Sequence, residues 1–182
     1  ELVLYEKVGI GAGQGASNPW LQELPDPVTR ATWDNYVIVS PALARAILDI
    51  DLNNGGQADA YEVNPPKKVV KVTVGGKEIS LPVLIIPGTH PDTIGIAVGY
   101  GRSNNIGKAA AGVGKNAFPL ATLSNGVVSY SNNSVEITVT GEKYPVALTQ
   151  THNRYDTTQG NRTEVMKELT LADYKKHPTE NS

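Results

Sequence analysis

The stretch PGTHPDTIGIAVGYGRSNNIGKAAAGVGKNAFPL, from Pro87 to Leu120, is the part of the sequence from which the fold is interpreted. Seven of its residues are glycine, and an apolar run from Thr93 to Val98 lies in its middle. Glycine tolerates positive φ and lets other groups approach the backbone closely. The pattern therefore predicts a strand flanked by tight loops, with a positive φ at one or more of Gly99, Gly101, Gly112 and Gly114.

The same loops carry polar side chains that leave two interpretations open. Hydrogen-bonding and basic residues stand among the glycines, namely Thr89, Asn104, Asn105, Asn116, Arg102, Lys108 and Lys115. Such loops suit a flat anionic ligand that has many acceptors. Glycine-rich turns are also ordinary connections in all-β proteins, and in that case the loops bind nothing.

Composition limits the classes of function. The 182 residues fit one domain, or one domain and a tail. The net charge of −2 provides no general basic field for nucleic acid or an anionic membrane. The lack of cysteine excludes disulfides, thiolate catalysis and cysteine-ligated clusters within this chain, and no run of 18 apolar residues predicts a membrane span. The start at Glu1 without a signal peptide leads us to expect a piece of a longer protein or a processed chain.

The rest of the chain predicts mainly short strands. The clearest pair is Val69–Val74 and Ile79–Ile86, because Gly75-Gly76 between them is a hairpin signal. Pro82 within the second run predicts a bulge or a sheet edge. Further strands are expected at Leu2–Val8, Tyr36–Val39, Ala58–Val63, Gly126–Tyr130, Val135–Thr140 and Val146–Thr149, with a turn at Gly141. About eight short strands favour a closed β barrel over an open sheet.

Helices are predicted at one or two places only. Ser40 and Pro41 provide a cap and a first helical residue for a helix over Ala42–Ile50. The three prolines within Asn18–Asn35 exclude a long helix there and predict an extended connector, for which Trp20 and Trp33 are the expected anchors. A second short helix is predicted at Thr163–Tyr174, within the polar segment that follows Gln150.

The residues do not assemble a catalytic or metal-binding pattern. The histidines His90, His152 and His177 have no metal-ligand spacing or carboxylate partner beside them, and no GxSxG elbow is present. The loop Gly9–Ser17 has neither the P-loop nor the GxGxxG pattern. We therefore predict no catalytic residue and no metal ligand in this chain, so that any redox role consists of holding a group on which another part of the protein acts.

Several blocks of sequence, in order, resemble a known family. They are NPWLQELPDP, TWDN, SPALA, LIIPGTHPDTIGIAVGYGR and GVGKNAFPL. Together they are similar to the C-terminal molybdopterin-dinucleotide-binding domain of the molybdopterin oxidoreductases. The greatest similarity is to polysulfide-reductase-like proteins and to the large iron–sulfur subunit of alternative complex III, a quinol:cytochrome c oxidoreductase. The TQTH and RTEVMKELTLADYKKHP segments resemble the connection to the ferredoxin-like domain of that subunit.

This resemblance implies a fold and a site. The fold is a mainly-β, double-psi β barrel of the aspartate-decarboxylase type over residues 1–150, followed by a polar tail and linker over 151–182 that leads toward a further domain. The implied cofactor-binding residues are Asn18, Trp20, Thr89, His90, Tyr100, Arg102, Lys115 and Asn116. Backbone N–H groups and asparagines suit the edges of a pterin, and Arg102 or Lys115 suits a pyrophosphate.

The implied function has two versions. The segment LDIDLNNGGQADAYEV departs from the family pattern, and the domain of the alternative complex III branch is thought to lack the molybdenum cofactor. We therefore expect a non-catalytic scaffold without cofactor in a periplasmic respiratory complex. Its partners would be the other domains of its chain, cytochrome c and membrane subunits. The alternative is a domain that binds molybdopterin guanine dinucleotide in an active molybdenum oxidoreductase. An unrelated β-barrel module that binds a small ligand or glycan is a third possibility.

Overall fold

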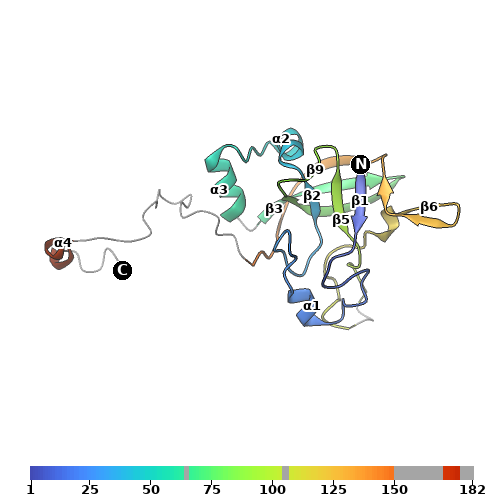
Figure 1. Cartoon of the computed structure of the whole chain (residues 1–182), viewed down its shortest axis with the longest axis horizontal. Coiled ribbons are helices and arrows are strands. Elements are labelled where there is room, and N and C mark those ends of the chain that lie inside the picture. The colour runs from blue at the N-terminus through green and yellow to red at the C-terminus, as the bar shows by residue number, and fades with distance from the viewer. Residues whose placement is uncertain (64–65, 104–106, 150–169, 177–182) are drawn as a thin grey trace. The chain divides into compact units, whose positions relative to one another are not determined.

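The computed structural model describes residues 1–63, 66–103, 107–149 and 170–176, and most of its elements are strands (Figure 1). The strands are β1 (Leu2–Tyr5), β2 (Val37–Val39), β3 (Pro66–Val74), β4 (Lys77–Ile85), β5 (Ile94–Ala97), β6 (Thr122–Ser124), β7 (Val127–Ser129), β8 (Ser131–Asn132) and β9 (Glu136–Pro145). Seven of them form one mixed sheet in the order β8-β1-β5-β2-β4-β3-β9, while β6 and β7 pair separately. The predicted mainly-β fold is confirmed. Within the described part of the chain, no strand pairing joins β8 to β9 to close the sheet into a barrel.

The central hairpin forms as predicted. β3 and β4 pair antiparallel, with Val74 opposite Lys77 across the two turn glycines, which have φ of 55° and 77°. A two-residue turn with two positive φ angles matches the twist of the flanking strands. The bulge or edge expected at Pro82 is wrong, because β4 lies between β2 and β3. The pairing of β4 with β3 ends at Pro82, and its pairing with β2 begins at Val83. Because Pro82 lies at this change of partner, the N–H that proline lacks is not needed for a ladder hydrogen bond.

One of the two helices in the middle of the chain was predicted and the other was not. In α2 (Pro41–Leu48), the Ser40 hydroxyl accepts a hydrogen bond from the Leu43 N–H at 3.0 Å, as a cap should. The strand expected at Ala58–Val63 is wrong, because these residues belong to α3 (Gly55–Val63). The alternation there is weak, and the Asn54 carbonyl accepts the Ala58 N–H at 2.9 Å to begin a helix.

The last strands differ from the prediction at Gly141. The expected turn at this residue is wrong, since β9 continues through it with a φ of 80°. The register of β9 against β3 shifts between Lys68 and Val70, so the extra residues of β9 form a bulge that includes Gly141. The strand expected at Val146–Thr149 is also wrong, and only an isolated bridge between Ala31 and Leu148 is present.

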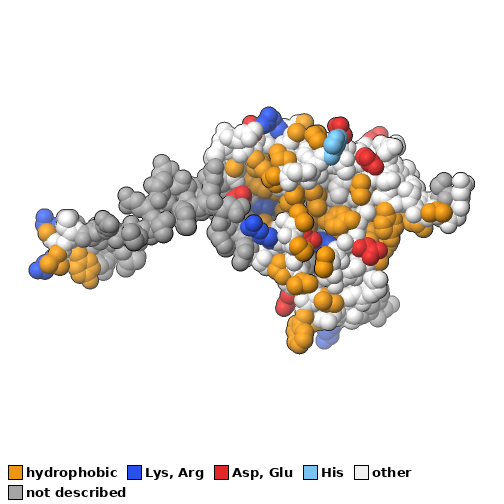
Figure 2. Space-filling view, in the orientation of Figure 1, with side chains coloured by type: hydrophobic (Ala, Val, Ile, Leu, Met, Phe, Trp, Pro, Cys, Tyr) orange, Lys and Arg blue, Asp and Glu red, His pale blue; other side chains and the backbone are white. Residues whose placement is uncertain are grey.

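The proline-containing connector is not fully extended. It contains the short helix α1 (Pro19–Glu23). The expectation that Trp20 is an anchor is wrong, since 80% of its surface is exposed, while Trp33 is half-buried. Figure 2 shows hydrophobic side chains at the surface in the region of α1. The main core lies elsewhere, where α2 covers the sheet and Leu48 packs with valines such as Val72.

The chain divides into two compact units, residues 1–151 and 152–182. The first also contains the 3-10 helix η2 (Phe118–Leu120). The structure of the second is described only for residues 170–176, where α4 (Leu171–Lys176) is the one helix. The first part of the helix predicted at Thr163–Tyr174 lies outside the described residues. Among the described helices, none combines the length and apolar character that crossing a membrane requires.

Candidate functional site

The predicted site residues lie at two different ends of the sheet. Thr89 and His90 precede β5, whereas Tyr100, Arg102, Lys115 and Asn116 follow it. β1 runs parallel to β5, so the chain that follows β1, which leads to α1, lies at the same end of the sheet as the chain that follows β5 (Figure 1). The structure therefore separates Thr89 and His90 from the other candidates. The His90 Nδ1 atom accepts the Asp92 N–H at 3.2 Å within its own turn.

Three of the predicted residues meet in one pocket, which we call the loop pocket. It has a volume of about 290 Å³ and is lined by Gly99, Tyr100, Gly101, Arg102, Asn116 and Phe118. Tyr100 is buried, Arg102 is half-buried and Asn116 is exposed. The loop pocket is the place where the sequence-predicted residues actually come together.

Close contact between backbones explains the glycines around this pocket. All four glycines considered in the prediction have positive φ, between 61° and 93°, so that prediction is confirmed. A Cβ on Gly101 would lie 2.2 Å from the Asn116 backbone nitrogen, and one on Gly99 would lie 2.7 Å from the Gly13 nitrogen. Since real Cβ atoms do not approach other atoms so closely, these glycines let three loops pack directly against each other.

Arg102 binds the loop that follows β1. Its guanidinium lies over Gly13 and donates to the carbonyl oxygens of Ala12 and Gly99, both at 3.4 Å. The Arg102 carbonyl in turn accepts the Gly112 N–H at 3.2 Å. The side chain that was predicted to meet a pyrophosphate thus connects neighbouring loops of the chain itself.

The two predicted asparagines use their acceptor oxygens to bind backbone N–H groups two positions further along the chain. The Asn18 Oδ1 atom accepts the Trp20 N–H at 3.0 Å at the start of α1. The Asn116 Oδ1 atom accepts the Phe118 N–H at 3.1 Å at the start of η2. Each interaction satisfies a backbone N–H that the helix leaves without an intrahelical partner.

Asn35 and Asp34 hold the loop before Lys115 in place, and the sequence interpretation missed this role. Asn35 is fully buried, and its Nδ2 donates to the carbonyls of Ala97 and Lys115, both at 2.9 Å, while its Oδ1 accepts the Lys115 N–H at 2.9 Å. The Asp34 carboxylate accepts the Gly114 N–H at 3.2 Å. These partners are 62 to 80 positions away, so no local pattern indicates them.

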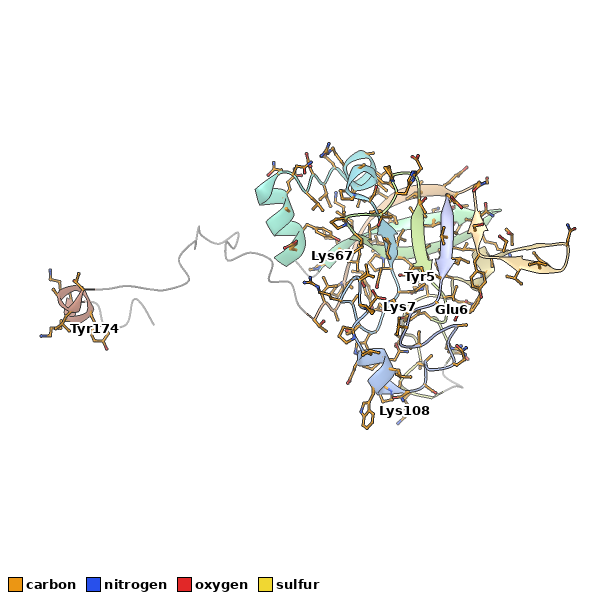
Figure 3. All side chains as sticks on the ribbon, in the orientation of Figure 1. Tyr5, Glu6, Lys7, Lys67, Lys108 and Tyr174 are labelled. Atoms are coloured by element: carbon orange, nitrogen blue, oxygen red, sulfur yellow. The ribbon has the colours of Figure 1, made fainter. Side chains whose placement is uncertain are left out.

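A buried lysine supports the same end of the sheet. Lys7 follows β1 and is labelled in Figure 3. Its ammonium donates to the Asp34 carbonyl at 2.9 Å and lies 4.2 Å and 5.2 Å from the ring centroids of Tyr36 and Tyr100. Burial lowers the pKa of Lys7 to about 8, although Asp26 and Asp34 oppose the shift. Carbonyl and aromatic contacts are how a buried ammonium is compensated without a direct carboxylate partner.

Three tyrosines complete the surroundings of Lys7. Burial raises the pKa values of Tyr5, Tyr36 and Tyr100 well above the usual range, so all three stay neutral phenols. The Tyr36 hydroxyl makes a short hydrogen bond with the Thr29 hydroxyl. The buried Tyr5 hydroxyl lies beside that of Tyr36 but has no partner in hydrogen-bond geometry among the described residues.

Comparison with known proteins does not assign the chain to a family. No protein-family model matches it, and no curated protein matches it in sequence. Within the described ranges, no group of three or more histidine, aspartate or glutamate side chains is placed to hold a metal ion. Inferences about function therefore rest on the geometry of the site and on the resemblance of the sequence blocks.

Proposed function

We propose that this chain is a non-catalytic domain of a molybdopterin-oxidoreductase-type subunit, related to a double-psi β barrel, that serves as a scaffold without cofactor in a respiratory electron-transfer complex. In this proposal the complex lies on the periplasmic side. The domain contacts other domains of its own subunit, among them a ferredoxin-like iron–sulfur domain, and the complex contains cytochrome c and membrane subunits.

The observation that carries the proposal is the internal use of three groups expected to meet the cofactor, those of Arg102, Asn18 and Asn116. Arg102 donates to two backbone carbonyls, and the Asn18 and Asn116 oxygens accept backbone N–H groups near the starts of α1 and η2. Thr89 and His90 lie at the opposite end of β5. The described residues therefore fit a dinucleotide poorly, because binding one would first break contacts that hold the loops together. Leaving those groups unpaired would cost affinity.

The alternative is a domain that binds molybdopterin guanine dinucleotide in an active enzyme. The observation that favours it is the loop pocket, which places Arg102 beside Tyr100 and Asn116 in a volume of about 290 Å³. A guanidinium at the edge of a concave, partly aromatic surface is a usual arrangement for binding a phosphate. The two proposals therefore differ in what Arg102 does.

Replacing Arg102 separates the two proposals. In the intact protein we expect Arg102→Gln to lower the stability of the domain, because two hydrogen bonds between loops are lost, but to leave electron transfer per assembled complex near the wild-type level, since a scaffold needs no anion contact at this position. Arg45→Gln, which removes an exposed arginine of α2 that pairs with Asp51, is the matched control. Loss of electron transfer in Arg102→Gln alone, with assembly intact, would contradict the scaffold and support the dinucleotide site.

The cofactor content of the purified protein is the direct test. We expect no molybdenum by metal analysis and no fluorescent pterin released on denaturation. Stoichiometric molybdenum or pterin in the wild-type protein, together with its loss in Arg102→Gln, would overturn the proposed scaffold function.

A further inference from the structure

A second pocket lies on the other side of the Lys115–Asn116 segment, and we call it the β9 pocket. Its volume is about 260 Å³, and it shares no lining residue with the loop pocket. The buried residues Val69, Leu81 and Pro82, from β3 and β4, provide an apolar floor. The volume is slightly below the usual range for ligand pockets, so any ligand must be small.

The bulge in β9 shapes one wall of this pocket. The Thr140 hydroxyl donates to the Val69 carbonyl at 3.0 Å, and the strand then passes through Gly141 before it pairs again at Lys143. This local irregularity places Glu142 and Tyr144 on the pocket wall. Bulges commonly redirect side chains in this way next to binding sites.

Next to Tyr144, the lining of the pocket includes a carboxylate held in a fixed orientation. Asp34 is half-buried, and its Oδ1 accepts the Gly114 N–H at 3.2 Å while its Oδ2 accepts the Tyr144 hydroxyl at 3.0 Å. Partial burial and the nearby Asp34 charge raise the pKa of Tyr144, which keeps the phenol as the donor of this bond. The wall therefore carries a negative charge whose position is set by two hydrogen bonds.

Two exposed charges of opposite sign also line the pocket. Among the described residues, the ion pairs involve neither Lys115 nor Glu142, and the hydrogen bonds of these two residues are made by their backbone atoms and not by their charged groups. Exposed pairs do form elsewhere on the chain, for example between Lys71 and Glu78 at 3.2 Å. The two charges at the β9 pocket thus stay available, one of each sign, above an apolar floor.

We propose that the β9 pocket binds a small zwitterion with an aliphatic body, of the class of a free aliphatic α-amino acid. The ligand ammonium faces the carboxylates of Asp34 and Glu142, and its carboxylate faces the Lys115 ammonium. Its side chain covers Val69, Leu81 and Pro82. Charge-assisted hydrogen bonds to both ends provide selectivity, and the floor provides apolar burial. This inference does not depend on the proposed scaffold function.

Three ligands of nearly equal size test the proposal. L-Leucine carries both charges, leucinamide lacks the carboxylate, and 4-methylpentanoate lacks the ammonium. We titrate each into the isotope-labelled protein and follow the amide signals of residues 80–82, 112–115 and 142–144. L-Leucine should bind roughly tenfold or more tightly than either analogue, because each analogue leaves one protein charge without its partner. Absence of saturable L-leucine binding at these signals would refute the proposal.

Two substitutions assign the charges. Lys115→Met should remove the preference for L-leucine over leucinamide, and Glu142→Gln should weaken the preference over 4-methylpentanoate. Both side chains are exposed, so neither substitution threatens the fold. Lys77→Met and Glu136→Gln change the same residue types outside the pocket and should leave both preferences unchanged. Preferences that persist in Lys115→Met and Glu142→Gln, or that vanish equally in the controls, would overturn the assignment.

Discussion

Asn35 is the side chain on which the site end of the sheet depends most. It stands just before β2, is fully buried, and makes three hydrogen bonds of 2.9 Å to the backbone. One bond reaches the Ala97 carbonyl at the end of β5, and two reach the Lys115 backbone. A single amide therefore connects the start of one strand, the end of another and the loop between the two pockets.

The cost of removing this amide follows from those bonds. Asn35→Ala loses three hydrogen bonds at about 1 kcal/mol each, which gives about 3 kcal/mol, with more where a backbone group is left buried and unpaired. Asn35→Asp has almost the same shape but loses both donated bonds and places a carboxylate against two carbonyl oxygens. We therefore expect Asn35→Asp to be less stable than Asn35→Ala at neutral pH, although it is the smaller change in shape.

Denaturant unfolding of the purified variants measures this, with the midpoint shift converted through an unchanged m-value. Hydrogen exchange should also show faster exchange of the Lys115 amide in Asn35→Ala. Asn132→Ala is the control, since it removes an exposed local bond of 2.8 Å to the Ser134 N–H and should cost below about 1 kcal/mol. A loss under about 1 kcal/mol in Asn35→Ala, or an Asn35→Asp variant as stable as the wild type, would refute the reasoning.

Three further predictions concern stability. Val72→Ala should cost about 1–3 kcal/mol in denaturant melts because Val72 is fully buried, and a shift near zero would contradict its burial. Gly101→Ala should cost about 2–4 kcal/mol of stability, because Gly101 has a positive φ and an added Cβ would meet the Asn116 backbone. Gly112→Ala should cost only about 1–2 kcal/mol, because Gly112 has a φ of 72° but open space around it. Equal losses in the two variants would mean that the contact between Gly101 and the Asn116 backbone adds nothing. Folding lowers the pKa of Lys7 from 10.5 to about 8, so between these pH values the unfolded state binds more protons than the folded state, and the free energy of unfolding should rise as the pH increases from 8 toward 10. Denaturant melts at several pH values should show a smaller rise for Lys7→Met than for the wild type. An identical rise in both would refute the burial of the Lys7 charge.

The elements that the sequence predicted correctly are those specified by neighbouring residues. The hairpin of β3 and β4 needs only alternating valines and Gly75-Gly76, and α2 needs only Ser40, Pro41 and an apolar face. In both cases the turn or cap lies within a few positions of the residues that it organises. The Asn125-Gly126 turn between β6 and β7 has the same kind of signal, with φ of 50° and 79°, and the hairpin was missed because Gly126 was interpreted as the start of a strand.

The errors occur where distant contacts override local patterns. The sequence of α3 is compatible with a strand, but the segment is a helix whose Tyr61 packs on the core and accepts the Ile85 N–H of β4 at 2.7 Å through its hydroxyl. Gly141 has the composition of a turn, yet pairing with β3 carries β9 through it as a bulge. Neither outcome is visible in a short window, because the deciding partner is remote in sequence.

The candidate site was predicted only in its glycines and in three of its pocket residues. The polar side chains that position it are Lys7, Asp34 and Asn35, and they come from the beginning of the chain. Each of these side chains binds backbone atoms. Since every residue type has the same backbone groups, the sequence does not indicate which residue is the partner. The glycines in the sequence therefore indicate where the chain turns tightly, but the sequence does not indicate which side chains hydrogen-bond to those turns and fix them.

These same contacts determine what the two pockets have in common. Asn35 holds the Lys115 backbone at both its N–H and its carbonyl, and Lys115–Asn116 is the segment between the pockets. Since the backbone is fixed there, the Lys115 and Asn116 side chains project from a preformed support and not from a loop that must order on binding. Binding at either pocket then avoids much of the entropy cost of ordering the loop. The structure thus favours ligands that accept the existing geometry. In the β9 pocket the Lys115 ammonium and the Glu142 carboxylate make no hydrogen bond within the described residues, whereas in the loop pocket Arg102 and the Asn116 oxygen already bind backbone groups, so the β9 pocket is the better candidate for binding.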